Sequence, residues 1–374
     1  MLVDKQKSNV LVIAEAGVNH NGSLERALEM VEVAAAAGAD YVKFQTFQAA
    51  AIVSADAPKA DYQARLTGTQ ESQLEMLRQL ELSRDDHLVL QARCREHGIR
   101  FLSTPFDLSS LHLLCNELAL DTIKLPSGEL TNAPLLMAAA RSGCQLIVST
   151  GMAYLEEVEA ALAVLAFGLI EKTRVPAQQD ELFAAYRSEA GRQALREKVV
   201  LLHCTTEYPA PYESINLRAM DTLHSAFGLP VGLSDHSAGI AIPIAAAARG
   251  ACVIEKHFTL DRRLPGPDHQ ASLEPAELKA AVAGIRAAEL ALGDGNKQPA
   301  TVEQSNRLIA RKSLVAARAI KAGEILSADV IAIKRPGNGI SPMCYWNVLG
   351  QLSDRDYCPD EPLSVALQTE SGHR

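Results

Sequence analysis

Two histidines stand at equivalent places in the sequence, each shortly after an apolar run. His236 closes the polar cluster that follows residues 231–233, and His257 closes the one that follows residues 252–254. If both runs are buried parallel strands joined through a helix, the two imidazoles face each other across one end of a barrel. A lone histidine at such a place is more often a hydrogen-bonded structural residue. Two of them favour a divalent metal ion with open coordination positions.

The elements that would position these histidines repeat along the first 290 residues or so. Short apolar runs, typical of strands buried on both faces, alternate with helical stretches. The predicted strands are residues 10–14, 41–45, 100–104, 122–125, 145–149, 198–203, 230–232 and 252–254. Eight such units favour an α/β fold of the (β/α)₈ TIM barrel type over an open doubly wound sheet. No G-x-G-x-x-G motif follows the first strand, which argues against dinucleotide binding.

Composition shifts predict the domain boundaries. Residues 1–293 form the predicted barrel, residues 294–310 a linker, and residues 311–374 a small β-rich domain. Within the barrel, residues 47–80 form a long excursion that we expect to serve as a lid or substrate wall. The charged, Gln-rich stretch at 171–197 is predicted to be a peripheral insertion with a solvated surface helix.

The composition is that of a soluble globular protein, with 48% hydrophobic and 22% charged residues. A formal net charge of −9 argues against a nucleic-acid partner. The seven cysteines form no C-x-x-C motif, which predicts reduced thiols in the cytoplasm. No secretory signal and no apolar run of about 18 residues is present, so we expect neither export nor membrane insertion.

The carboxyl ends of the predicted strands carry most of the chemically active side chains, and active sites of such barrels lie there. These residues are Glu15, Lys43, Gln45, Ser103, Thr104, Lys124, Ser127, Glu129, Ser149, Thr150, Thr206, Tyr208, Ser234, His236, Glu255 and His257. Two lysines among several hydroxyls would bind a phosphate or phospho-carboxylate group. Glu15 and Glu129 are either acid–base groups or ion-pair partners of the lysines. The residues alone therefore predict a metal-assisted enzyme for a small anionic substrate. They leave carbon–carbon bond formation, phosphate transfer and hydrolysis open.

A family resemblance runs through residues 9–362. Segments that occur here in order resemble those of the bacterial sialic acid synthases: IAEAGVNHNGS, YVKFQTF, APKADYQ, ESQLEMLRQLEL, FLSTPFD, IKLPSGELTN, IVSTGMA, LHCTTEYPAP, GLSDHS, EKHFTLD and PGPDH. The tail, RKSLVAARAIKAGE followed by KRPGNGISPM, resembles that family's C-terminal SAF (antifreeze-like) domain. The stretch at 171–197 has no counterpart that we can identify.

The resemblance implies a cytoplasmic transferase of EC class 2.5.1 in sialic acid biosynthesis. It would condense phosphoenolpyruvate with N-acetylmannosamine and water, giving N-acetylneuraminate and phosphate by metal-assisted C–C bond formation and C–O cleavage. The alternative is N,N'-diacetyllegionaminate synthase, acting on 2,4-diacetamido-2,4,6-trideoxymannose, with the difference expected at residues 56–65. We favour N-acetylneuraminate because APKADYQ and RPGNGISPM look more like that branch. A pseudaminate synthase and a non-catalytic sugar-binding barrel are remoter alternatives.

The resemblance also implies roles for individual residues. The metal ligands are His236 and His257, with Mn²⁺ as the expected ion and Mg²⁺ or Co²⁺ as options. Phosphoenolpyruvate is bound by Lys43, Thr104, Lys124, Ser127, Ser149 and Ser234. The catalytic residues at the reacting centre are Glu15, Gln45, Tyr208, Glu255 and Asp268, with Glu15 handling the proton of water. The sugar is bound by Glu129 and by Arg335 of the other subunit, which implies a domain-swapped homodimer. His269 has no counterpart as a ligand.

Overall fold

The computed structural model describes residues 9–54, 57–58 and 72–364 of the 374-residue chain. The chain divides into two compact units, Met1–Gly293 and Asp294–Arg374. The first unit holds the barrel and the second a small β-rich domain. Within the described ranges, no helix combines the length and hydropathy needed to cross a bilayer.

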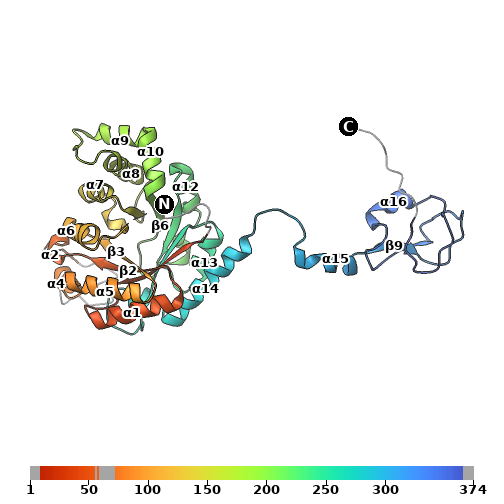
Figure 1. The fold of residues 1–374 in the computed structure, drawn as a ribbon, viewed down its shortest axis with the longest axis horizontal. Helices are drawn as coiled ribbons and strands as arrows, with labels where there is room; N and C mark the ends of the chain where they lie inside the picture. The colour runs from red at the N-terminus through yellow and green to blue at the C-terminus, as the bar shows by residue number, and fades with distance from the viewer. Residues whose placement is uncertain (1–8, 55–56, 59–71, 365–374) are drawn as a thin grey trace. The chain divides into compact units, whose positions relative to one another are not determined.

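An eight-stranded parallel sheet forms the centre of the first unit and confirms the predicted (β/α)₈ barrel (Figure 1). Its strands are β1 (Leu11–Gly17), β2 (Tyr41–Thr46), β3 (Arg100–Pro105), β4 (Thr122–Leu125), β5 (Gln145–Ser149), β6 (Val199–Cys204), β7 (Val231–Asp235) and β8 (Val253–His257). Hydrogen-bonded neighbours follow the order β3-β2-β1-β8-β7-β6-β5-β4. The outer strands β3 and β4 also contact each other, which completes the ring.

Helices in the connections cover the outside of the barrel (Figure 1). The longer ones are α1 (Leu24–Ala37), α5 (Arg84–Glu96), α7 (Ala133–Arg141), α8 (Leu155–Ile170), α12 (Ala219–Phe227), α13 (Ala241–Ala248) and α14 (Pro275–Leu292), while α6 (Leu108–His112) continues into the π-helical turn η1 (Leu113–Glu117). The helix α1 begins as predicted because the Ser23 hydroxyl accepts the backbone N–H of Arg26. It ends at Gly38, whose φ of +83° favours glycine.

Side chains on the strands alternate between an inner and an outer core, as the two-residue period of a strand requires. The inner core consists of Ile13, Tyr41, Leu102, Ile147, Val200, Leu202 and Val253. Glu15, Lys43 and Glu255 each lie two positions after one of these inner-core residues, so their side chains also point into the barrel. The register of β1 and β2 pairs Glu15 with Lys43. The barrel interior is therefore apolar at one end and charged at the other.

Three strands extend beyond the apolar runs that predicted them. The strand β1 continues to Gly17, β7 to Asp235 and β8 to His257. The polar residues at these ends were expected to follow directly after the strands. They remain in the strands because their buried side chains meet partners of opposite charge, which removes most of the cost of burial.

The excursion after β2 carries two short helices, α2 (Ala49–Ile52) and α4 (Gln73–Arg78). The helix α4 begins with a capping box, in which the side chains of Ser72 and Glu75 each accept the other's backbone N–H. Residues 56–65, where the choice of sugar was predicted to reside, lie outside the described residues except for 57–58.

The insertion at 171–197 is helical, as predicted, but it forms two packed helices rather than one solvated helix. They are α9 (Gln179–Arg187) and α10 (Glu189–Lys198), and both contact α8. Leu195 is 2% exposed and Ala185 is 8% exposed. Because the stretch is rich in charged residues, its apolar stripe was not recognised in the sequence; in the structure α8 covers this stripe.

The second unit begins with residues 294–310, which were predicted to be a linker. Part of this stretch is helical, as the turn η4 (Thr301–Glu303) and the helix α15 (Gln304–Ala310). The domain that follows contains an antiparallel pair, β9 (Ser313–Ala316) and β10 (Ile331–Lys334), and the short helix α16 (Tyr345–Val348). Its separate small core includes Leu314, Ile320, Leu326, Val330 and Tyr357.

Candidate active site

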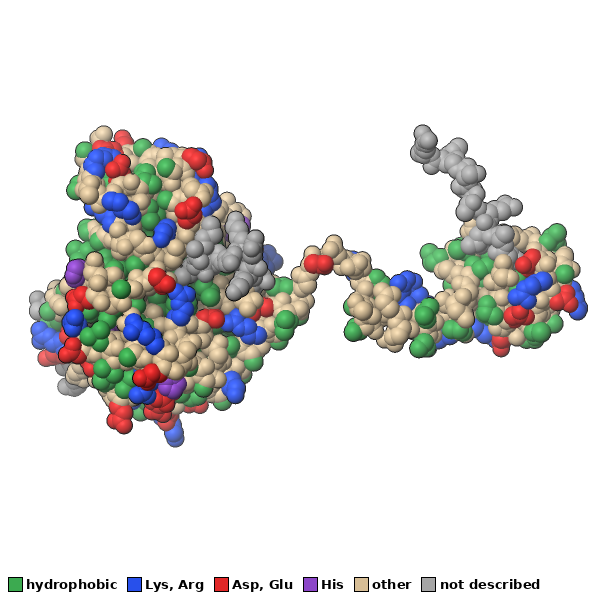
Figure 2. Space-filling view, viewed as in Figure 1, with side chains coloured by type: hydrophobic (Ala, Val, Ile, Leu, Met, Phe, Trp, Pro, Cys, Tyr) green, Lys and Arg blue, Asp and Glu red, His purple; other side chains and the backbone are tan. Residues whose placement is uncertain are grey.

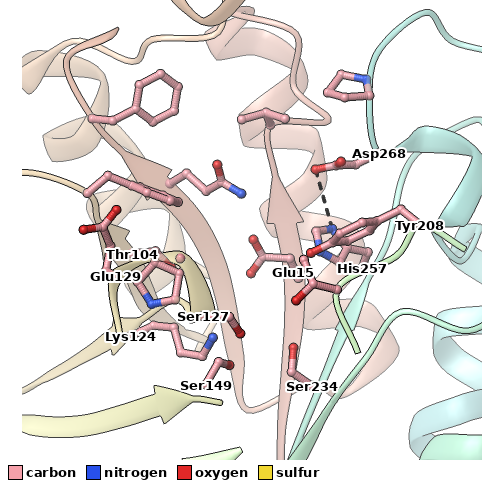
Figure 3. A pocket seen from close by; sticks show the side chains of 18 of the residues that line it. Glu15, Thr104, Lys124, Ser127, Glu129, Ser149, Tyr208, Ser234, His257 and Asp268 are labelled. Carbon is pink, nitrogen blue, oxygen red and sulfur yellow. Dashed lines mark ion pairs between the residues drawn. The ribbon is translucent and has the colours of Figure 1, made fainter. Parts of the chain in front are cut away.

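A pocket of about 350 Å³ opens at the carboxyl ends of the barrel strands, which we call the mouth (Figure 3). It brings together every barrel residue to which the sequence assigned a role. These are Glu15, Lys43, Gln45, Thr104, Lys124, Ser127, Glu129, Ser149, Tyr208, Ser234, His236, Glu255, His257 and Asp268. In Figure 3, Lys124 and most of the hydroxyls lie on one side, Tyr208, His257 and Asp268 on the other, and Glu15 between them.

The floor of the mouth is a buried network of two carboxylates and two ammonium groups. Lys43 forms an ion pair with Glu15 and lies 3.7 Å (Nζ–Oε2) from Glu255. Lys124 Nζ lies 3.2 Å from Glu255 Oε1, which also accepts a 2.7 Å hydrogen bond from Ser234 Oγ. All four charged side chains are at most 5% exposed. The charges balance one another, which is how the barrel tolerates two buried lysines.

The two carboxylates of this network have opposite proton affinities. Burial raises the pKa of Glu15 to about 7, against the opposing effect of Lys43. Burial also acts on Glu255, but Lys124 and Lys43 outweigh it and bring its pKa to about 2. Burial lowers the pKa of Lys124, which Glu255 only partly offsets. Near neutral pH, Glu255 is thus a fixed anion, whereas Glu15 can take up and release a proton.

Hydroxyl groups surround the lysines. Lys43 Nζ donates to Thr104 Oγ1 at 3.0 Å. The Ser127 hydroxyl accepts the backbone N–H of Gly151 at 2.9 Å, and a Cβ on that glycine would come within 2.8 Å of Ser127 Oγ. Ser149 Oγ is buried and has no hydrogen-bond partner within the described part of the chain. Two ammonium groups surrounded by hydroxyls, one of which has no hydrogen-bond partner, are the kind of groups that bind phosphate.

The two histidines meet at the mouth, with ring centroids 5.4 Å apart. His236 Nδ1 lies 2.7 Å from the carbonyl oxygen of Thr205. Donation from Nδ1 to that carbonyl leaves Nε2 with a free lone pair, the arrangement usual for a metal-binding imidazole. The Nδ1 atom of His257 is buried without a hydrogen-bond partner among the described residues. Burial, His236 and Lys43 lower the pKa of His257 well below its usual value, so this ring is neutral.

These observations fit two ligands of a divalent metal ion. Neutral imidazoles are good donors for first-row metals, and an unpartnered buried nitrogen is costly unless something binds it. Groups of three or more His, Cys, Asp and Glu side chains able to hold an ion are absent from the described ranges. An ion at this place would therefore keep several positions for water or substrate oxygen atoms.

Two further side chains lie against the histidines. The ring centroid of Tyr208 is 4.1 Å from that of His236 and 5.6 Å from that of His257. Asp268 Oδ2 lies 4.0 Å from His257 Nδ1, the contact drawn as a dashed line in Figure 3. Burial raises the pKa of Asp268 to about 6. Both residues thus stand where a substrate bound near the histidines would meet them.

A buried ion pair on the outside of the barrel holds the turn that carries His236. Lys256 Nζ lies 2.7 Å from Asp235 Oδ2 and also donates to the carbonyl oxygen of Ser237. The other oxygen of Asp235 accepts the Ser237 backbone N–H at 2.9 Å. The side chains of Asp235 and Lys256 are 0% and 2% exposed. They clamp the chain on both sides of His236.

The outer wall of the pocket is apolar, and most of it comes from the excursion at 47–80 that was expected to serve as a lid or substrate wall; the individual side chains that form it were not predicted. We use outer wall for Val18, Phe47, Ile52, Val53, Met76, Leu77, Leu80, Phe106 and Met152, all of which line the pocket. Val18, Phe47, Met76 and Leu80 also form a small buried cluster. Phe47 and Phe106 directly follow β2 and β3. Their positions could have been found from the sequence, but aromatic residues gave no chemical signal.

Three other residues have distinct surroundings. Glu129 Oε2 accepts a 2.7 Å hydrogen bond from Asn132. His269 does not line the pocket; its ring nitrogens lie 2.7 Å from Thr259 Oγ1 and 3.1 Å from Asn21 Oδ1. Arg335 belongs to the second unit, where its Nε donates to the carbonyl oxygen of Ala310 at 3.0 Å.

Comparisons with known proteins agree with this picture. The NeuB family model matches residues 30–297, and the SAF domain model matches residues 311–366. N,N'-diacetyllegionaminic acid synthase of Campylobacter jejuni is 50% identical over 94% of this chain and 98% of its own length. The enzyme with the same name from Legionella pneumophila is 44% identical, over 91% of this chain and 89% of its own.

A solved structure of the N-acetylneuraminic acid (sialic acid) synthetase of Leptospira borgpetersenii, in complex with citrate, superposes with a TM-score of 0.63. It is 34% identical, and the match covers 80% of this chain and 90% of that one. The expected resemblance to sialic acid synthases is confirmed, and so is the SAF domain. The barrel fold, the residues at its mouth and these matches together show that the chain belongs to the NeuB family.

Proposed function

We propose that this protein is an N,N'-diacetyllegionaminate synthase. It condenses phosphoenolpyruvate with 2,4-diacetamido-2,4,6-trideoxymannose and water, and releases phosphate. The single observation that carries the chemistry is the mouth, where Lys43, Lys124 and four hydroxyls lie beside two facing imidazoles and a carboxyl group that titrates near neutral pH. This proposal replaces the preference for N-acetylneuraminate. Two relatives, 50% and 44% identical over nearly the whole chain, are named as legionaminic acid synthases. This similarity outweighs the two short segments, APKADYQ and RPGNGISPM, on which the earlier preference rested.

The outer wall supports the same sugar. Compared with N-acetylmannosamine, the proposed sugar has a methyl group at C6 and an acetamido group at C4 where the other has hydroxyls. Methyl groups gain about 0.8 kcal/mol each on burial against apolar side chains such as Phe47 and Phe106. An apolar pocket discriminates against an added hydroxyl by about 100-fold. We therefore expect a kcat/KM for the diacetamido sugar about 10- to 100-fold above that for N-acetylmannosamine.

The residues of the mouth have separate tasks in the proposed reaction. Lys43 and Lys124, with the hydroxyls of Thr104, Ser127, Ser149 and Ser234, hold the phosphate and carboxylate of phosphoenolpyruvate. The Glu15 carboxylate takes the proton of the water that adds at C2, after which phosphate leaves by C–O cleavage. Tyr208, Asp268, Gln45 and Glu255 orient the sugar and the reacting centre, and Glu129 contacts the sugar further out.

A divalent ion, with Mn²⁺ as the first candidate, would be held by His236 and His257 and would polarise the aldehyde oxygen of the open-chain sugar. Carbon C3 of phosphoenolpyruvate attacks that aldehyde. Most of the contribution of the protein is positioning and electrostatic stabilisation, because the charged groups are already in place before the substrates arrive.

The test is release of phosphate from phosphoenolpyruvate with Mn²⁺ and each sugar in turn. Rapid release with the diacetamido sugar and slow release with N-acetylmannosamine is the expected result. A preference for N-acetylmannosamine would refute the assignment of the sugar but keep the synthase. If neither these sugars nor the pseudaminate precursor releases phosphate, the synthase proposal fails.

We also propose that two copies of the chain exchange their second units, so that Arg335 of each copy completes the mouth of the other. Hydrophobic side chains are exposed on the second unit (Figure 2), which supports a surface that a second copy covers. Among them, Val302, Met343 and Trp346 are 81%, 82% and 77% exposed. The variants Arg335→Ala and Lys124→Ala should each be inactive alone. Mixed and reassembled, they should recover part of the activity, because some heterodimers then contain one intact site. Absence of any recovery would contradict the exchange.

A further inference from the structure

A pair of thiols lies at the end of the barrel opposite the mouth. Cys144 directly precedes β5, whose last residue Ser149 lines the mouth, and Cys115 belongs to the π-helical turn η1. Their Sγ atoms are 3.5 Å apart. Both residues line a second cavity, of about 610 Å³, and none of the described residues lining this cavity also lines the active-site pocket. The thiols thus form a site of their own.

The geometry is close to that of a disulfide. A disulfide has an S–S distance of about 2.05 Å, so the sulfur atoms need to approach by about 1.5 Å. Cys144 is 5% exposed and its Sγ lies 3.1 Å from the carbonyl oxygen of Leu120. Cys115 is half-buried on a turn. The approach therefore requires movement of a short turn and leaves the strand in place.

The two thiols differ in ionisation. The hydrogen bond between them lowers the pKa of Cys144 to about 6 and raises the pKa of Cys115. Burial raises the pKa of both Cys94 and Cys252 to about 12. Because the thiolate is the reactive form, Cys144 is the expected nucleophile and Cys115 the thiol that resolves it.

We propose that Cys115 and Cys144 form a reversible redox site that reacts with a hydroperoxide. The Cys144 thiolate attacks one peroxide oxygen, the O–O bond breaks, and a sulfenic acid and hydroxide result. Cys115 Sγ then attacks Cys144 Sγ; the S–S bond forms, the S–O bond breaks, and the departing hydroxyl leaves as water with the proton of Cys115. In sum, two thiols are oxidised to one disulfide while hydrogen peroxide is reduced to water. A dithiol reductant reverses the reaction.

The bridge would link positions 29 residues apart, joining η1 to the start of β5 across the whole of β4. A cross-link of this span restricts the unfolded chain and so stabilises the barrel. Because it forms at the end away from the mouth, its effect falls on the stability of the fold rather than on the groups that bind substrate.

The test is to oxidise the fully reduced, full-length protein with one equivalent of hydrogen peroxide. Peptide mapping should show one cross-link, Cys115 to Cys144, with the loss of two hydrogen atoms, and dithiothreitol should reverse it. The thermal midpoint should rise by several degrees on oxidation. The control Cys358→Ser removes the exposed thiol and should behave like the parent protein.

The variant Cys115→Ser separates the two steps. It should form no cross-link and show no thermal shift, and dimedone should trap a sulfenic acid on Cys144. A bridge between any other pair, oxidation of Cys358 while Cys115 and Cys144 stay reduced, or no dimedone adduct in this variant would overturn the proposal. Should the variant fail to fold, the peptide map of the parent protein alone decides.

Discussion

Replacing Lys256 by methionine tests whether the buried ion pair behind His236 holds the turn of the mouth. The methionine fills most of the volume of the lysine but leaves the Asp235 carboxylate, which is 0% exposed, with only the Ser237 backbone N–H as a partner. Breaking a buried pair by removing one charge costs about 3–5 kcal/mol. For a domain of this size, each kcal/mol lowers the thermal midpoint by about 2–4 °C. We expect Lys256→Met to lower the midpoint of the barrel by roughly 10 °C.

The double variant Lys256→Met/Asp235→Asn supplies the matched control. An asparagine still accepts the Ser237 N–H but carries no charge, so most of the loss should be recovered. Differential scanning fluorimetry measures all three proteins, and Mn²⁺ affinity reports on the position of His236. A single variant within about 2 °C of the parent, or a double variant no better than the single one, would refute the reasoning.

Four further predictions concern the mouth and its wall. Phosphate release should fall as the pH drops through about 7, because protonation of Glu15 removes the carboxylate that accepts the proton of water; Glu15→Gln should be slow and lack this limb of the pH–rate profile. Lys124→Met should lower kcat/KM for phosphoenolpyruvate by about 100-fold or more, measured in a titration with that substrate, since a charge-assisted contact to phosphate is lost; an unchanged value would contradict the assignment. His257→Ala should retain its circular dichroism but lose bound Mn²⁺ in metal analysis, and chelation of the parent protein should abolish turnover; full turnover after chelation would exclude a metal role. Met152 has a φ of +65°, a backbone conformation that favours glycine, so Met152→Gly should not lower the thermal midpoint. In competition assays the variant should show a smaller ratio of kcat/KM for the diacetamido sugar to that for N-acetylmannosamine. An unaltered ratio would remove this residue from the outer wall.

The sequence was sufficient to predict the barrel because its strands are short, apolar and separated by helices. The strands β4 and β5 occur with the predicted bounds. The charged floor of the mouth was harder, since Glu15 and Glu255 were expected just after the predicted strands but lie within strands. Whether such a residue can stay in a buried strand depends on an opposite charge from a neighbouring strand, and this contact is not local in sequence.

Other features depend on contacts that no local pattern reveals. The insertion at 171–197 has an apolar stripe that only becomes evident once α8 covers it. Cys115 and Cys144 are 29 residues apart, and the spacing of cysteines does not determine which of them meet. The metal, the paired subunits and the roles of the individual residues at the mouth remain predictions of the family resemblance.

The position of the outer wall has a consequence for how members of this fold can diversify. The charged groups are on the barrel strands, where each depends on its neighbours for charge balance and can hardly be exchanged singly. Much of the wall belongs to the excursion after β2, including Ile52 and Met76 on its short helices. Selectivity for the sugar can then drift through changes in one connection while the condensation chemistry stays intact. Transplanting that connection between synthases is a route to new nine-carbon sugars without redesign of the reaction centre.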